Sequence, residues 1–189
     1  MPVRAIPLLA LVLLAQVDYA REAIALGKTH DDALYESFNK GYSLAPSDTI
    51  DNAEIVTEFR RAVMIVREKA SMGDYAITER DLNTAIAPYL GKVTYIVQAR
   101  LNPMNTFIKP PAYDLYVSTG PTSKPIAPEN LKRDPVYAIG PPGSAIVAVR
   151  LEAAFKRADI LSARVPMLVV INDHADIVWQ TRVDLSRFR

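Results

Sequence analysis

Residues 91–101, Gly-Lys-Val-Thr-Tyr-Ile-Val-Gln-Ala-Arg-Leu, decide the fold because the spacing of apolar residues changes there. From Val93 to Leu101 every second residue is apolar, an alternation that is typical of a strand with one buried face. Upstream of Gly91 the apolar residues recur every three or four positions, which is typical of helices. The sequence therefore predicts a helical segment over residues 21–91 and a sheet domain over residues 92–189.

Further runs downstream of Leu101 have the composition of strands and are separated by Pro, Gly and Asn/Asp clusters. They are residues 113–119, 135–139, 145–151, 167–171 and 177–185. A helical crossover is expected at most once among them, over residues 153–162, so antiparallel pairing is favoured. The expected fold class is α+β, with an N-terminal helical segment followed by an antiparallel β-sandwich-like domain, and a small barrel is the alternative.

Helices are expected over residues 19–26 and 31–42. A long helix is predicted from Asp51-Asn52 to Gly73, because apolar residues in that stretch lie three or four apart (Ile55, Phe59, Ala62, Val63, Val66 and Ala70). A short helix is predicted over residues 78–90, where Thr78 and Asp81 have the spacing of a capping box.

The first twenty residues have the order of an export signal, with Arg4 followed by an apolar run over residues 5–15. As a helix, that run would cover about 16 Å, roughly half of a bilayer core, so a stable membrane span is not expected after processing. We therefore expect a signal peptide over residues 1–20 and a periplasmic or secreted protein. The alternative is a retained helix over residues 7–26 that packs into the fold.

The composition excludes several classes of function. The chain has no cysteine, so disulfides, thiol catalysis and a lipid anchor on cysteine are excluded. With 22 Lys and Arg against 21 Asp and Glu, it lacks the basic excess of a nucleic-acid-binding protein. Its two histidines, His30 and His174, do not have metal-ligand spacing, so neither a metal nor a cofactor is expected. The cluster at residues 172–176 is expected to form a hairpin turn rather than a calcium site.

Prolines concentrate between residues 103 and 142, and this pattern predicts rigid surface loops, where binding sites often form. Four aromatic residues beside these loops are the candidates for a ligand-binding surface, namely Phe107, Tyr113, Tyr116 and Tyr137. The alternative is that the prolines only block pairing at sheet edges. The single tryptophan, Trp179, is expected in the core because it alternates with apolar residues.

These patterns favour a non-enzymatic, extracytoplasmic binding or interaction module whose partner is a protein or a cell-envelope glycan. The alternative is a carboxylate-dependent hydrolase acting on envelope glycans, with Asp114 and either Asp134 or Glu129 as the acid–base pair. A third interpretation is self-association through Phe38, Tyr42 or the apolar stripe from Ile55 to Ala70 in the helical segment. The sequence pattern does not fix the oligomeric state.

Overall fold

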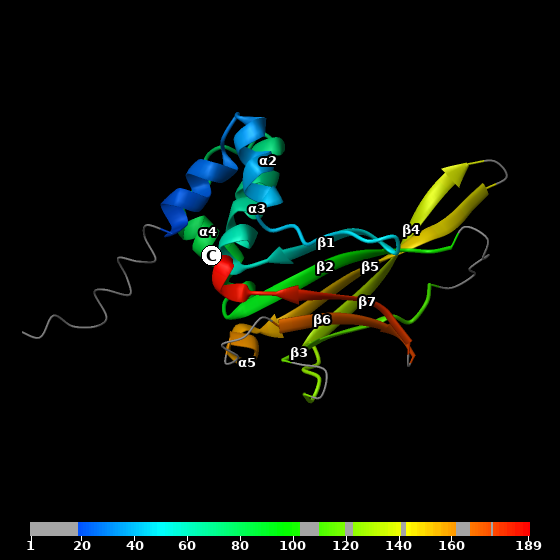
Figure 1. Ribbon diagram of the computed structural model, residues 1–189. Helices are drawn as coiled ribbons and strands as arrows, with labels where there is room; N and C mark the ends of the chain where they lie inside the picture. The colour runs from blue at the N-terminus through cyan, green and yellow to red at the C-terminus, as the bar shows by residue number, and fades with distance from the viewer. Residues whose placement is uncertain (1–18, 103–109, 120–122, 141–142, 162–166, 175) are drawn as a thin grey trace, which may run out of the picture. The chain divides into compact units, whose positions relative to one another are not determined.

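The structure is a computed structural model that describes residues 19–102, 110–119, 123–140, 143–161, 167–174 and 176–189 (Figure 1). Residues 1–18 of the expected signal peptide, and the candidate Phe107, lie outside the described residues. The described chain forms two compact units, which we call the helical unit (residues 19–38 and 58–90) and the sheet unit (residues 39–57 and 91–189). The fold class is α+β, as the sequence predicts. Among the described helices, none combines the length and the apolar character needed to cross a bilayer.

The sheet unit holds two antiparallel sheets in a sandwich-like arrangement (Figure 1). Its described strands are β1 (Ile50–Val56), β2 (Lys92–Arg100), β3 (Asp114–Ser118), β4 (Asn130–Gly140), β5 (Gly143–Lys156), β6 (Met167–Asp173) and β7 (Asp176–Val183). The first sheet has the order β1-β2-β5-β4 and the second has the order β3-β6-β7. Antiparallel pairing needs only short connections, which fits the turn-rich spacing of the sequence.

Alternate residues of both sheets meet in one apolar core. Tyr95 of β2 and Phe155 of β5 pack edge to face there, with ring centroids 5.7 Å apart. The short helix α5 (Arg157–Leu161) contributes Ile160 to this core, and the 3₁₀ turn η2 (Leu185–Arg187) contributes Leu185. Trp179 is also part of the core, with only 7% of its surface exposed, as the alternation predicts.

Two of the sheet edges are covered by neighbouring segments. Beside β1, the Leu44 amide donates to the Ala53 carbonyl (2.7 Å) and the Ile55 amide donates to the Tyr42 carbonyl (2.9 Å). Beside β3, Val117 and Ile126 exchange two backbone hydrogen bonds of 3.0 and 2.7 Å. Strand β4 is the other edge of its sheet, and Pro135 within it lacks a backbone donor.

The helical unit contains a helix at residues 19–27, α2 (Asp32–Lys40, of which residues 32–38 belong to this unit), α3 (Glu58–Ser71), α4 (Glu79–Ile86) and the 3₁₀ turn η1 (Ala87–Tyr89). Gly27 allows the first helix to approach α3 closely, because a Cβ atom at this position would lie 2.5 Å from the Cβ of Val66. Gly73, at a φ of +85°, ends the turn after α3 as the sequence predicts.

Three boundaries differ from the sequence prediction. Residues 50–56 form a strand, so the helix expected from Asp51 begins instead at Glu58. Strands β4 and β5 are longer than expected because they pair with each other from Asn130↔Ala154 to Gly140↔Gly143. The segment expected to be a helical crossover over residues 153–162 is helical only at α5. The expected hairpin turn lies between β6 and β7, where His174 has a φ of +55°.

Candidate functional site

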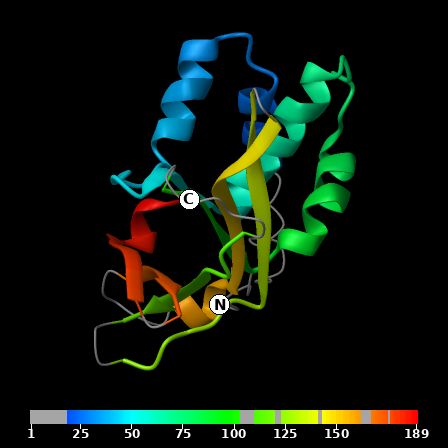
Figure 2. The same cartoon turned by 90° about the vertical axis from the view of Figure 1, so that its right-hand side faces the viewer.

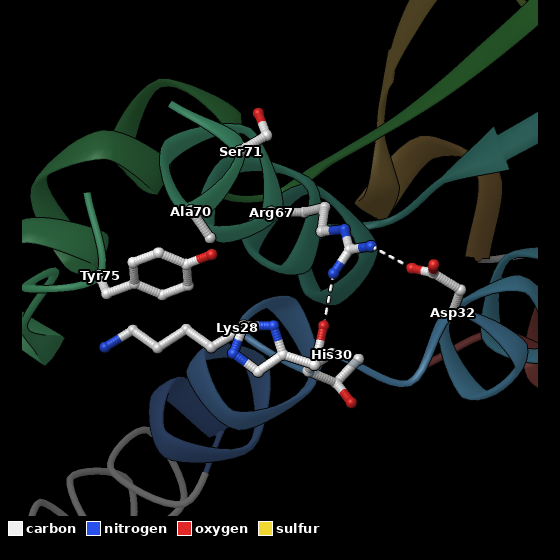
Figure 3. Close-up of a pocket in the computed structure, with 8 residues that line it drawn as sticks. Lys28, His30, Asp32, Arg67, Ala70, Ser71 and Tyr75 are labelled. Carbon is white, nitrogen blue, oxygen red and sulfur yellow. Dashed lines mark hydrogen bonds and ion pairs between the residues drawn. The ribbon is translucent and has the colours of Figure 1, made fainter. Parts of the chain in front are cut away.

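A polar pocket of about 240 Å³ lies within the helical unit (Figure 3). Its lining residues are Lys28, Thr29, His30, Asp32, Arg67, Ala70, Ser71 and Tyr75. Lys28, Thr29 and His30 belong to the connection between the helix at 19–27 and α2, and Asp32 lies on α2. Arg67, Ala70 and Ser71 lie in the second half of α3, and Tyr75 lies in the loop after it. Nothing in the sequence pattern pointed to this pocket.

The connection at residues 28–31 is held in place by caps at both of its ends. The Lys28 amide donates to the Ile24 carbonyl (3.0 Å), which closes the last turn of the first helix. At the other end, the Asp31 carboxylate accepts from the Leu34 amide (3.0 Å), so Asp31 is the N-cap of α2. Thr29 and His30 are therefore presented between two fixed helix ends.

Arg67 connects α3 to this loop. Its guanidinium donates to the Thr29 carbonyl, and its Nη2 lies 2.7 Å from Oδ1 of Asp32 (Figure 3). It also lies over the ring of Tyr35, at 4.7 Å from the ring centroid. With 29% of its side chain exposed, Arg67 remains accessible to solvent. These three contacts fix the orientation of a permanent positive charge at the pocket.

Lys28, His30 and Tyr75 form the opposite side of the pocket (Figure 3). Nζ of Lys28 donates to the Ile77 carbonyl at 3.3 Å, a contact that uses one of its three N–H donors. The rings of His30 and Tyr75 lie 5.8 Å apart and are tilted by 39°. Within the described chain, neither the His30 ring nitrogens nor the Tyr75 hydroxyl takes part in a hydrogen bond between side chains or to the backbone.

The charge balance of the lining favours a negatively charged ligand group. Lys28 and Arg67 carry positive charge, and Asp32, which pairs with Arg67, is the one acidic residue of the lining. Donors from Lys28, His30 and Tyr75 can form charge-assisted hydrogen bonds with a carboxylate or a phosphate. Among the residues that the structure describes, no group of three His, Cys, Asp or Glu side chains is placed to hold a metal ion.

The structure separates the aromatic residues that the sequence proposed as a binding surface. Tyr113 lies in the core of the sheet unit with 8% of its surface exposed, and burial, with a smaller contribution from the charge of Asp173, raises its pKa. Tyr137 lies on β4 and is 55% exposed. Tyr116 lies on the outer face of β3. The described three are therefore not gathered in one site, and their role in binding stays a prediction.

Tyr116 contributes to a second, smaller pocket of about 140 Å³ on the outer face of the β3-β6-β7 sheet. Tyr116, Val170 and Gln180 lie side by side across the three strands and form its central row. The other lining residues are Ser118, Ser123, Pro125, Leu168 and Ile177. This lining is uncharged, so it offers a ligand less electrostatic attraction than the pocket in the helical unit.

The carboxylates proposed for a hydrolase are each engaged with a basic side chain. Asp114 pairs with Arg133 at 2.6 Å, Asp134 with Lys132 at 2.8 Å, and Glu129 with Lys156 at 3.2 Å. Arg133 also donates to the Tyr113 carbonyl at 2.7 Å, which ties β4 to the start of β3. None of these three carboxylates lines either of the two pockets described above.

Phe38 and Tyr42, proposed for self-association, are occupied by internal packing. Phe38 packs edge to face on Phe59 in the helical unit, with ring centroids 5.9 Å apart. Tyr42 is buried in the sheet unit, where its ring lies 5.7 Å from that of Phe188. Neither ring is presented as an open surface.

Comparison with known proteins identifies no relative: no protein-family model matches the sequence, and neither a curated protein nor a solved structure is significantly similar to the chain.

Proposed function

We propose that this protein is a non-enzymatic binding module that acts outside the cytoplasm and binds a ligand through an anionic group. Its location outside the cytoplasm is inferred from Arg4 and the apolar run over residues 5–15. Its ligand class is inferred from the pocket in the helical unit. The single observation that carries the proposal is the placement of Arg67, Lys28 and His30 around one pocket with only one opposing carboxylate.

Each basic side chain has a different part in this proposal. Arg67 is held by Thr29, Asp32 and Tyr35, so its guanidinium has a fixed orientation at the pocket, and the Asp32 carboxylate offsets part of its charge. Lys28 and His30 supply hydrogen bonds to the ligand, because their donors are not used up by internal contacts.

The test is a titration of the full chain with inorganic phosphate and with acetate, followed by NMR. We expect shifts confined to the amides of residues 28–32 and to the side chains of His30 and Tyr75. Lys28→Gln should raise the dissociation constant by about tenfold, the equivalent of losing one charge-assisted hydrogen bond.

The control is Lys40→Gln, which removes an equal charge from α2 at a position outside the pocket. It should leave the dissociation constant within a factor of about two, because only screened, long-range attraction changes. Equal losses in Lys28→Gln and Lys40→Gln would mean that the anion binds nonspecifically. A complete lack of shifts at residues 28–32 would remove the pocket from consideration.

A further inference from the structure

Strands β4 and β5 extend beyond the rest of their sheet as a two-stranded ribbon (Figure 1, Figure 2). Strand β2 ends at Arg100, which lies opposite Ala148, and the Leu101 amide still donates to the Val147 carbonyl at 2.9 Å. Among the described residues, the part of β5 before Val147 has no strand on its β2 side. The paired residues from Tyr137↔Ile146 to Gly140↔Gly143 therefore lie past the end of β2. We call the paired residues 136–140 and 143–148 the ribbon. Within the described chain, the β4 side of the ribbon is a sheet edge along its whole length, and the β5 side pairs with no strand over residues 143–146.

The ribbon is unusual in charge and in exposure. Between Asp134 and Arg150 the sequence has no Asp, Glu, Lys, Arg or His. In the same stretch Tyr137 is 55% exposed and Val147 is 38% exposed, and Ala138 and Ala145 are also exposed. Natural proteins protect open strand edges with charged side chains. On β4 such side chains, Lys132, Arg133 and Asp134, lie only before the ribbon. An isolated two-stranded ribbon is at best marginally stable in water, so this surface favours a further strand.

We propose that the ribbon is a self-association site, at which β4 pairs antiparallel with β4 of a second copy of this chain. Among the described residues β4 pairs only with β5, so its outer edge is open for a further strand. Antiparallel pairing about a twofold axis places the same uncharged stretch on both sides and brings no like charges together.

The sequence of β4 sets the limits of this pairing. Pro135 lacks a backbone donor, and Lys132, Arg133 and Asp134 place charges before it. The stretch available for pairing is therefore residues 136–140, and its central residue is Ala138. In the dimer Ala138 lies opposite its own copy, and the two four-stranded sheets join into one continuous sheet. A charged foreign peptide fits this edge poorly, whereas the second copy matches it in length and in its lack of charge.

The test uses the full chain with single substitutions at Ala138. Sedimentation velocity over a range of concentrations should show a reversible dimer for the unsubstituted chain. Ala138→Lys and Ala138→Glu should each raise the dimer dissociation constant by about tenfold or more, because two like charges meet at the axis. A mixture of these two variants should recover dimers, since the opposite charges then face each other. Circular dichroism confirms that each variant is folded.

The matched control is Ile177→Lys, which adds the same charge at another exposed apolar strand residue, 57% exposed on β7. It should leave the dimer unchanged. The chain has no native cysteine, so Ala138→Cys also provides a single thiol for cross-linking. Opposed residues in antiparallel strands lie about 4.5–5.5 Å apart at Cα, within the range of a disulfide. Mild oxidation should therefore give a covalent dimer with Ala138→Cys and not with Ile177→Cys.

Four results would overturn the proposal. One is a monomer for the unsubstituted chain at every concentration tested. Another is a dimer that Ala138→Lys and Ile177→Lys weaken equally, which would place the contact elsewhere. The third is a mixture of Ala138→Lys and Ala138→Glu that stays monomeric while each variant is folded. The fourth is a different protein that binds the ribbon while this chain stays monomeric, which would show that the partner of the ribbon is not a second copy.

Discussion

Tyr95 places a hydroxyl group in the apolar core of the sheet unit. Its side chain is fully buried, and within the described chain its hydroxyl oxygen has no hydrogen-bond partner. Burial also raises the pKa of this hydroxyl far above its ordinary value, because the charged form would lack solvation there. The edge-to-face contact with Phe155 explains why a ring fits here, and the hydroxyl itself contributes nothing to that contact.

We therefore expect Tyr95→Phe to raise the free energy of unfolding by about 1 kcal/mol, because it removes an unsatisfied polar atom and keeps the ring. Tyr95→Leu at the same position should lower the free energy of unfolding by about 2–3 kcal/mol, since it loses the ring and leaves a cavity. Urea unfolding followed by fluorescence measures both values. A Tyr95→Phe variant that is clearly less stable would show that the hydroxyl is bonded in solution.

Helix α4 begins with a complete capping box. The Thr78 hydroxyl accepts from the Asp81 amide at 3.2 Å, and the Asp81 carboxylate accepts from the Thr78 amide at 3.0 Å. Hydrogen bonds from the Thr78 side chain and then from its backbone lower the pKa of Asp81 below its ordinary value of 3.8. The ionised Asp81 carboxylate thus stabilises the fold at pH values above 3.8. This contribution is lost as the pH falls below 3.8 through the lower pKa of the folded state.

Thr78→Ala should lower the free energy of unfolding at neutral pH by about 1 kcal/mol, the usual effect of losing an N-cap. The loss should shrink as the pH falls below 3.8, because protonated Asp81 no longer supports the capping box in the unsubstituted protein either. Thr84→Ala is the control, since Thr84 lies in the same helix and only donates to the Arg80 carbonyl. Thermal unfolding at several pH values compares the two variants; equal, pH-independent losses would contradict the capping role of Thr78.

Most of the strands and helices could be predicted from the sequence, and β1 could not. Its core-facing residues, Ile50, Ala53 and Ile55, do not alternate strictly because the register shifts between Ile50 and Asn52. Ile55 and Phe59 also lie four residues apart across the junction between β1 and α3, so the strand extends the helical pattern by one more apolar position. The bulge interrupts the alternation expected of a strand, and the spacing of Ile55 and Phe59 matches that of a helix, so the sequence pattern did not predict β1.

The candidate site could not be predicted for a different reason. Lys28 and His30 lie in a short connection, and Arg67 and Tyr75 lie on α3 and after it, so contact between them depends on how the helices pack. That packing depends on Gly27, where a Cβ atom would contact backbone and side-chain atoms of α3. In the sequence, the His30-Asp31-Asp32 run predicts only the start of a helix, and Asp31 confirms that prediction as the N-cap of α2.

At the scale of the whole molecule, the helix at residues 19–27 constrains where the proposed signal peptide could be removed. Ala20 and Ala23 are buried in the core of the helical unit, and Tyr19 packs edge to face on Phe59 at 5.3 Å between ring centroids. Removal of residues 1–20 would delete two of these contacts. The helical unit therefore keeps its packing only when cleavage falls before Tyr19.

Under the proposed export, we expect the mature protein to begin between Gln16 and Tyr19, just after the apolar run that ends at Ala15. Expression of the full chain in a bacterium, cell fractionation and mass spectrometry of the purified protein would locate this N-terminus. A chain that begins at Arg21 outside the cytoplasm would show that the fold tolerates the loss of Tyr19 and Ala20. An intact chain in the cytoplasm would contradict the proposed export.

Strand β1 belongs to the sheet unit, whereas the residues before and after its segment belong to the helical unit. During synthesis the ribosome therefore releases β1 first, then α3 and α4, and only afterwards its partner β2. The helical unit can be complete while its enclosed strand still has one unpaired backbone edge and exposed apolar side chains. At this stage of translation the nascent protein can aggregate through β1, and a chaperone that covers this strand would protect it.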